Sequence, residues 1–201
     1  MKNIIETSKS FLSKENLLNI KIKQTEQIDQ KLLEECVEDI KDILDIKPPI
    51  KIFDKICYQR RDVGFFSDSS IGYHYANQLA KSKPMTINLD LLIELINDFF
   101  DSDFNGILIN RYTGGDEYIG AHSDDEKNIN KSGVIAISYG SERIFRIRDK
   151  KTKQIVKDIP IQNLDIIHMG GDFQKEFTHE IPPTKKDTGI RYSFTFRHHN
   201  I

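Results

Sequence analysis

Three residues in the second half of the sequence have side chains that can bind a metal ion. His122 and Asp124 are two positions apart, a spacing that turns both side chains to one face if the segment is a strand. His179 lies in a later run of strand character. Two imidazoles and one carboxylate on one side of a metal leave its other positions open for substrate and oxygen, as in non-haem Fe(II) oxygenases. The alternative is a chance pattern in which each histidine is only a hydrogen-bonded structural residue.

A second chemical feature is a strand-like run near the end of the chain with an arginine at each end. The even spacing of Arg191 and Arg197 puts both guanidinium groups on the same strand face as Ser193 and Thr195. Two guanidinium groups on a buried face are costly unless each meets a carboxylate. A dicarboxylate ligand would satisfy both.

The elements that must position these residues are predicted from the hydrophobic pattern. One helix is predicted before the Pro48-Pro49 stop, where apolar residues recur at helical spacing at Ile28, Leu32, Leu33, Cys36, Val37, Ile40 and Leu44. A second helix is predicted over about residues 88–101, with Asn88 as its N-cap. Strands separated by turns are predicted at 106–112, 134–139, 143–148, 154–159, 165–169, 177–181 and 191–197. Helices followed by strands predict an α+β fold, with the strands in a barrel or jelly roll flanked by the helices.

The composition fits one globular domain. The 201 residues are 38% hydrophobic and 30% charged, and Lys+Arg 29 against Asp+Glu 31 exclude a polybasic coat, so any nucleic-acid contact must be local. Two cysteines form no metal-binding spacing or disulfide framework, and the first residues lack a secretory signal, so we expect an intracellular protein, in the nucleus or cytoplasm. No run approaches the ~20 apolar residues of a membrane-spanning helix. We expect a monomer with no membrane partner.

Four motifs, in this order, resemble the AlkB family of Fe(II)- and 2-oxoglutarate-dependent dioxygenases. They are Asn110-Arg111-Tyr112, the segment 119–126 around His122 and Asp124, His179-Glu180-Ile181-Pro182, and the run from Arg191 to Arg197. The resemblance covers about residues 50–199 and implies a double-stranded β-helix core. It predicts a dioxygenase domain over residues 50–201, with residues 1–49 as a helical extension packed on it.

The resemblance also implies a role for each motif residue. His122, Asp124 and His179 would hold Fe(II), with O2 as a further substrate and ascorbate as a stimulant. The 2-oxoglutarate site would be formed by Asn110, Tyr112, Arg191, Ser193, Thr195 and Arg197. Ser193 stands where the family usually has asparagine. One hydrogen bond to the co-substrate is therefore expected to be shorter, water-mediated or absent.

Substrate recognition in the family pairs the iron centre with a lid over an extruded base, because a methyl group on a stacked base cannot reach buried iron. Tyr73 and Tyr75 stand where the family has its base-stacking pair, and Glu126 resembles the residue that reads an exocyclic amino group. Phe53 resembles the hydrophobic finger that replaces the flipped base. The structural alternatives are hairpin packing for the tyrosines, a solvated turn for Glu126 and a core anchor for Phe53.

A basic run over residues 143–153 is predicted to contact nucleic-acid phosphates. The residues assigned to this contact are Arg143, Arg146, Arg148 and Lys150. The alternative is an ordinary solvated face.

These expectations combine into one function. The chain is predicted to be an oxidative demethylase of N-alkylated bases in DNA or RNA, such as 1-methyladenine and 3-methylcytosine, which releases formaldehyde as 2-oxoglutarate and O2 become succinate and CO2. The same chemistry on messenger-RNA adenines or on a protein stays open. So does a non-catalytic nucleic-acid-binding module. A zinc hydrolase with the same three ligands is a weaker alternative, because it would have no use for the arginine pair.

Overall fold

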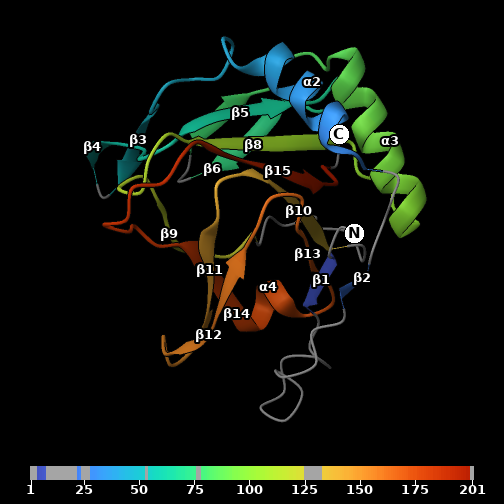
Figure 1. Ribbon diagram of the computed structural model, residues 1–201. Helices are drawn as coiled ribbons and strands as arrows, with labels where there is room; N and C mark the ends of the chain where they lie inside the picture. Colours follow the sequence, from blue (N-terminus) through green and yellow to red (C-terminus); the bar gives the residue numbers. More distant parts are fainter. Residues whose placement is uncertain are drawn as a thin grey trace.

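Two β-sheets form the body of the molecule in the computed structural model, and two helices cover the larger one (Figure 1). The structure describes residues 4–7, 22–23, 28–52, 54–75, 78–124 and 133–199. Within these ranges, no helix is both long enough and apolar enough to cross a membrane.

The larger sheet has seven strands in the order β2-β1-β13-β10-β15-β8-β5. Their bounds, in chain order, are β1 Ile4–Thr7, β2 Ile22–Lys23, β5 Asp62–Phe66, β8 Gly106–Tyr112, β10 Val134–Gly140, β13 Ile166–Met169 and β15 Arg191–Arg197. β15 pairs antiparallel with β10 on one side and β8 on the other, and it is buried along its whole length. The strand that carries both arginines is therefore an interior strand with no solvent-facing edge.

The smaller sheet has four strands in the order β12-β11-β14-β9. Their bounds are β9 Ile119–His122, β11 Arg143–Asp149, β12 Ile155–Ile161 and β14 Phe177–Ile181. A short helix, α4, spans Phe173–Glu176 and leads directly into β14. Apolar side chains from both sheets and from α4 form one buried cluster that includes Tyr112, Ile147 and Phe173. The two sheets thus share a core, and the three candidate metal ligands lie at its edge.

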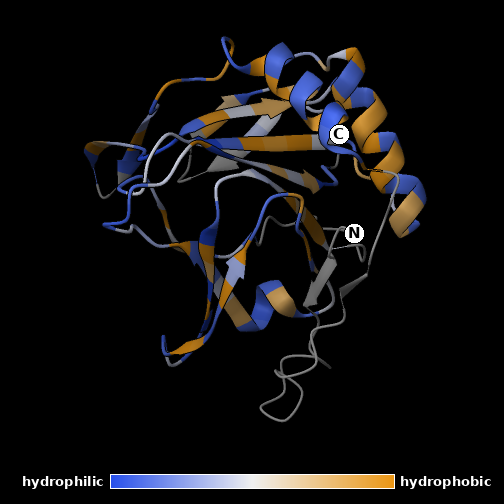
Figure 2. Ribbon diagram, viewed as in Figure 1, coloured by the Kyte–Doolittle hydropathy of each residue, from blue (hydrophilic) through white to orange (hydrophobic). Residues whose placement is uncertain are grey.

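Helices α2 (Gln30–Ile40) and α3 (Ile87–Phe100) pack against the larger sheet, and their apolar faces join its outer side in a second cluster. Figure 2 shows hydrophobic and hydrophilic residues alternating around both helices, as expected for helices with one buried face. The predicted N-cap of α3 is wrong. Thr86, not Asn88, is the N-cap, because Thr86 has an extended backbone and its hydroxyl accepts the Leu89 N–H at 3.2 Å. Asn88 lies inside the first turn, where its side chain donates to Asp39.

Two hairpins flank β5 in the chain. The predicted strands did not include them, although a hairpin at Tyr73 and Tyr75 was one of the alternatives. One is formed by β3 (Pro49–Ile52) and β4 (Lys55–Tyr58), and the other by β6 (Gly72–Tyr75) and β7 (Gln78–Lys81). Figure 1 shows the β3–β4 hairpin projecting from one end of the molecule. Both hairpins are thus separate from the two main sheets.

The first 49 residues contribute more than the predicted helix. β1 pairs in parallel with β13 and so adds a strand to the larger sheet, while α2 packs against α3. The division between an extension over 1–49 and a domain over 50–201 stays a prediction.

The cap of α3 can be tested by stability measurements. Thr86→Ala removes the acceptor for the Leu89 N–H, and losing such a cap typically costs about 0.5–2 kcal/mol. We expect the free energy of unfolding, measured by denaturant titration, to fall by that amount. Asn88→Ala is the matched control and should cost less, because the side-chain hydrogen bond that Asn88 makes to Asp39 is exposed. A larger loss for Asn88→Ala than for Thr86→Ala would contradict the assignment.

Candidate active site

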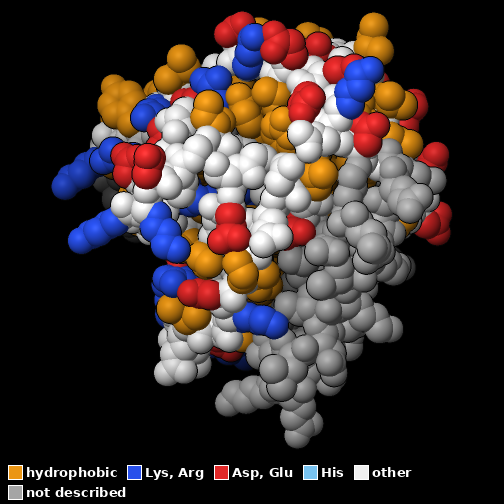
Figure 3. Space-filling view, viewed as in Figure 1, with side chains coloured by type: hydrophobic (Ala, Val, Ile, Leu, Met, Phe, Trp, Pro, Cys, Tyr) orange, Lys and Arg blue, Asp and Glu red, His pale blue; other side chains and the backbone are white. Residues whose placement is uncertain are grey.

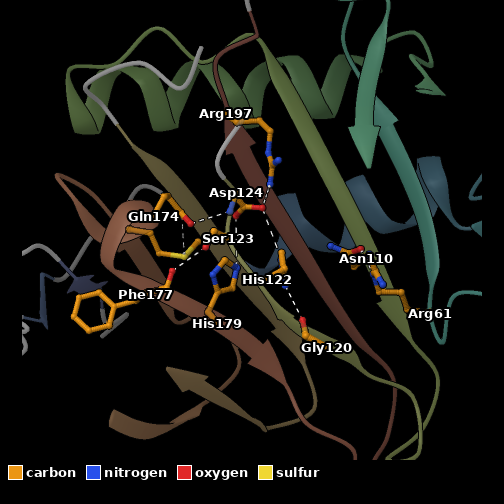
Figure 4. A network of polar contacts seen from close by, with 11 residues as sticks. Arg61, Asn110, Gly120, His122, Ser123, Asp124, Gln174, Phe177, His179 and Arg197 are labelled. Atoms are coloured by element: carbon orange, nitrogen blue, oxygen red, sulfur yellow. Dashed lines mark hydrogen bonds and ion pairs between the residues drawn. The ribbon is translucent and has the colours of Figure 1, made fainter. Parts of the chain in front are cut away.

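The three candidate metal ligands come together at the edge between the two sheets (Figure 4). His122 ends β9, His179 lies within β14, and the two residues are cross-strand partners. One ligand atom from each of the three residues lies within 4.8 Å of the others. Asp124 reaches this point from the loop after β9. The prediction that Asp124 shares a strand face with His122 is wrong, because the strand ends at His122.

Backbone and side-chain contacts hold His122 and Asp124 in place. The carbonyl of Gly120 lies 2.8 Å from His122 Nδ1; since a carbonyl only accepts, Nδ1 carries the proton and Nε2 faces the centre with a lone pair. The Asp124 N–H donates to Gln174 Oε1 at 2.9 Å, and the Ser123 hydroxyl donates to the Phe177 carbonyl at 2.9 Å. The ligand loop is thus tied to α4 and β14.

The electrostatics of the cluster favour the protonation states that a metal requires. Burial of Asp124 would raise the pKa of its carboxyl, but Arg197, whose Nη2 lies 3.0 Å from Oδ1, and the two histidines together lower that pKa below its ordinary range. Burial lowers the pKa of His179 to about 3, and burial also lowers the pKa of His122. Neutral imidazoles beside an ionised carboxylate are the state that binds a cation.

The donor set fits a divalent transition metal. Two imidazole nitrogens and one carboxylate match the facial arrangement used for Fe(II), and they leave the side toward the neighbouring pocket open. Among the side chains the structure describes, none gives His179 Nδ1, a buried atom, a hydrogen bond. The nitrogen of His179 that faces the other two candidate ligands is Nε2, which lies 3.5 Å from Asp124 Oδ2.

A pocket adjoins the cluster and is lined by strands of both sheets. β15 and β8 pair so that Ser193 is opposite Asn110 and Arg191 is opposite Tyr112, which places these side chains on one face. The pocket is lined by all six residues predicted for 2-oxoglutarate: Asn110, Tyr112, Arg191, Ser193, Thr195 and Arg197. The candidate metal ligands and the candidate co-substrate residues therefore share one site.

Arg191 is a buried cation that faces this pocket with unused hydrogen-bonding capacity. It is 3% exposed, and its Nε donates to the Ser138 hydroxyl at 2.9 Å. Its Nη1 has no hydrogen-bond partner among the described residues. Burial lowers the pKa of Arg191 to about 10, so the group stays charged at neutral pH. A carboxylate of a bound ligand would supply the missing partner and the missing negative charge.

Comparison with known proteins gives the family. A family model described as the 2OG-Fe(II) oxygenase superfamily matches residues 15–197. The chain belongs to the 2OG-Fe(II) oxygenase superfamily. Enzymes of this superfamily use Fe(II), 2-oxoglutarate and O2, for which the cluster and the arginine-lined pocket are suited.

Relatives of this oxygenase include two proteins named DNA oxidative demethylase ALKBH2. The one from Arabidopsis thaliana is 26% identical over 181 residues, which cover 75% of this chain and 57% of the relative. The one from Homo sapiens is 27% identical over 156 residues, which cover 74% of this chain and 60% of the relative. The chain thus spans less than two thirds of either relative. The resemblance to the AlkB family is confirmed.

A solved structure titled "The structure of OsALKBH1" supports the fold of this oxygenase. Its TM-score is 0.55 at 15% identity, and the match covers 86% of this chain and 93% of that one. At this identity the likeness concerns the fold alone. The predicted α+β class with a jelly-roll core is confirmed.

The predicted substrate residues of the oxygenase have different surroundings. Tyr73 is buried and lines the pocket, and Tyr75 lies at the end of β6. The predictions for Phe53 and Glu126, and for the side chain of Tyr75, fall outside the described residues. Their roles stay predictions.

The four basic residues predicted to contact phosphate make hydrogen bonds or ion pairs within the protein itself. Arg143 is buried, and its guanidinium donates to the carbonyls of Gly114, Gly115, Glu117 and Pro182, so we remove it from the residues proposed to contact phosphate.

The other three residues assigned to phosphate contact also have partners in the oxygenase. Arg146 makes a bidentate pair with Asp158, and Arg148 donates to Glu180. The Lys150 ammonium donates to the Gln174 carbonyl at 3.1 Å. These three side chains remain partly accessible, so phosphate contact stays a prediction for them.

Sequence reasoning missed two residues of the oxygenase site. Arg61 lines the pocket and donates from Nε to Asn110 Oδ1 at 2.6 Å, and only the Arg60-Arg61 pair in the sequence could have drawn attention to it. Gln174 holds the backbone of Asp124, and its sequence neighbourhood carries no signal for that contact.

Gln174→Leu tests the support of the metal centre. The substitution leaves the buried Asp124 N–H without its acceptor, and losing an outer partner of a metal site typically costs about 10–100-fold in metal affinity. We expect the dissociation constant for Fe(II), measured anaerobically by calorimetry, to rise by that factor. Lys175→Ala is the control, since its side chain is 81% exposed and pairs only with Asp172 among the described residues. Equal affinities for the two variants would contradict the role of Gln174.

The low pKa of His179 predicts a pH dependence of the metal-free protein. The pKa falls from 6.5 to about 3 on folding, so the unfolded state takes up the proton first as the pH drops. The stability held by the neutral ring is complete above pH 6.5 and is lost as the pH falls toward 3. Denaturant titration with a chelator present should show a steeper loss between about pH 7 and about pH 5 for the native protein than for His179→Gln. If the free energy of unfolding falls equally with pH in both proteins, His179 is not the cause of the pH dependence.

Proposed function

We propose that this chain is an oxidative demethylase of N-alkylated bases in DNA or RNA, such as 1-methyladenine and 3-methylcytosine, and that it works as a monomer in the nucleus or cytoplasm. The observation that carries the proposal is one pocket in which a buried, partly unsatisfied Arg191 adjoins the cluster of His122, Asp124 and His179. The names of the ALKBH2 relatives support the choice of DNA bases.

Each group has a task in the proposed reaction. Bound iron and 2-oxoglutarate supply the oxidising chemistry, in which the co-substrate and O2 become succinate and CO2 and one oxygen atom enters a C–H bond of the methyl group. The resulting hydroxymethyl group leaves the base nitrogen as formaldehyde. His122, Asp124 and His179 would hold the iron, while Arg191 and Arg197 would orient the carboxylates of 2-oxoglutarate.

Charge at one end of the molecule supports a nucleic-acid substrate. Figure 3 shows lysine and arginine side chains projecting over the end where β3 and β4 lie. Lys55 and Arg60 are exposed there, and the Arg60 carbonyl accepts the N–H of Tyr118, next to the start of β9. Cations beside the strand that ends in His122 would contact phosphates and make binding dependent on salt.

The test is a product assay on a panel of oligonucleotides. Purified protein with Fe(II), ascorbate and 2-oxoglutarate is incubated with methylated single- and double-stranded DNA and RNA, and mass spectrometry follows loss of the methyl group and release of formaldehyde. We expect demethylation that depends on 2-oxoglutarate. Asp124→Ala, which lacks the carboxylate ligand, should show none. Turnover on a methylated protein alone, or binding to nucleic acid without turnover by the native enzyme, would overturn the proposal.

Arg191→Ala tests the co-substrate site without relying on turnover. Removing the guanidinium leaves a ligand carboxylate unpaired in a buried pocket, a loss of about 2–5 kcal/mol. We expect the dissociation constant for 2-oxoglutarate, measured anaerobically by calorimetry on the metal-loaded protein, to rise at least about 30-fold. Arg146→Ala, which loses ion pairs with Asp158 and Glu180 on the face of β11 turned away from the pocket, should leave this dissociation constant unchanged. The same affinity in both variants would exclude Arg191 from the site.

A further inference from the structure

Tyr73, on β6, does not face the solvent as a free stacking platform would. Its side chain is buried, and its ring lies against the guanidinium of Arg197, with Cζ 4.6 Å from the ring centroid. This is a cation–π contact in a desolvated setting, where such contacts are strongest. The hairpin that carries the predicted lid residues is therefore in contact with an arginine of the co-substrate pocket.

The same guanidinium also contacts the candidate metal centre. Arg197 Nη2 lies 3.0 Å from Asp124 Oδ1, and Figure 4 shows Arg197 reaching down from β15 toward Asp124. Arg197 is 2% exposed, so little water competes for either contact. One planar group thus touches an aromatic ring of the hairpin and a candidate ligand of the metal.

Two other rings fix the position of Tyr73. Phe65 of β5 lies 6.1 Å from it, and His199 meets it edge-on at 6.0 Å. Phe65 and His199 also contact each other, with centroids 4.7 Å apart. The Tyr73 ring is thus packed from the larger sheet and from the end of the chain, and it presents a fixed surface to Arg197.

We propose that Tyr73 is a positioning residue that holds the Arg197 guanidinium against Asp124, and so couples the β6–β7 hairpin to metal and 2-oxoglutarate binding. The inference rests on the proposed function for the roles of Asp124 and Arg197. It differs from a base-stacking role, because it requires the ring even when no nucleic acid is bound. A displacement of the hairpin removes the ring from Arg197 and leaves that side chain free to rotate. The binding of both Fe(II) and 2-oxoglutarate then becomes weaker.

The experiment compares three substitutions of Tyr73 in the full chain without nucleic acid. Tyr73→Leu and Tyr73→Met remove the ring but keep an apolar side chain, while Tyr73→Phe keeps the ring. Dissociation constants for Fe(II) and for 2-oxoglutarate are measured anaerobically by calorimetry, with a melting curve for each variant. We expect about tenfold weaker binding of both ligands for Leu and Met, as for other outer partners of metal sites, and binding within about twofold of native for Phe. Leu79→Ala, a substitution on β7 of the same hairpin, is the control and should bind as the native protein does.

A double-mutant cycle separates the coupling from a general loss of packing. In an Arg197→Ala background, Tyr73→Leu should not weaken the binding of Fe(II) or of 2-oxoglutarate any further, because the guanidinium that Tyr73 positions is gone. Native affinities in the folded Leu and Met variants would overturn the inference, as would a Phe variant as weak as Leu.

Failure of this inference and failure of the proposed function give different results. If Arg197→Ala weakens the binding of both Fe(II) and 2-oxoglutarate while Tyr73→Leu weakens the binding of neither, only the proposed role of Tyr73 is wrong. If Arg197→Ala itself leaves both dissociation constants unchanged, the assignment of Arg197 in the proposed function fails, and the inference fails with it.

Discussion

The whole site depends on keeping one buried carboxylate, that of Asp124, ionised. A carboxylate away from water is costly unless it is paired and hydrogen-bonded, and removing a single partner of such a pair is strongly destabilising. Arg197 supplies the charge and Gln174 fixes the backbone. Arg197 belongs to an interior strand of the larger sheet, whereas Asp124 follows an edge strand of the smaller one. The ion pair between Arg197 and Asp124 therefore joins the two sheets at the candidate metal centre.

The charge balance of the pocket explains which ligands it can accept. Among the described residues that line it, Arg61, Arg191 and Arg197 are cationic, and Asp124 is the carboxylate that opposes them. A divalent cation bound at Asp124 increases the positive excess. A ligand with two carboxylates then neutralises half of it, so a bound metal favours the binding of a dianion and a bound dianion favours the binding of the metal. Two cofactors bound in one small site are in this sense electrostatically dependent on each other.

Sequence patterns predicted the elements whose signals are local and missed those that need distant partners. The strands at 106–112, 177–181 and 191–197 are found as predicted, since alternating or continuous apolar runs bounded by turns mark them. β1 was not predicted, because four residues at one end of the chain become a strand only through pairing with β13. The burial of Arg143 could not be predicted from the sequence either, since the carbonyls that accept its hydrogen bonds come from two separate loops. Local chemistry revealed the candidate ligands, whereas tertiary contacts decided which cations remained available.

The ion pairs of Glu180 have a consequence for strand register. Glu180 follows His179 on β14 and points to the opposite face of the sheet, where it pairs with Arg148 at 2.8 Å and with Arg146 at 3.8 Å. A slip of β14 by one residue would reverse every side chain, breaking these pairs and turning Glu180 into the apolar interior in place of His179. The ion pairs of Glu180 with Arg146 and Arg148 thus stabilise the observed register of β14. The shifted pairing would lose these ion pairs and is therefore disfavoured. The pairs of Glu180 on the outer face thus help to place the His179 imidazole on the inner face.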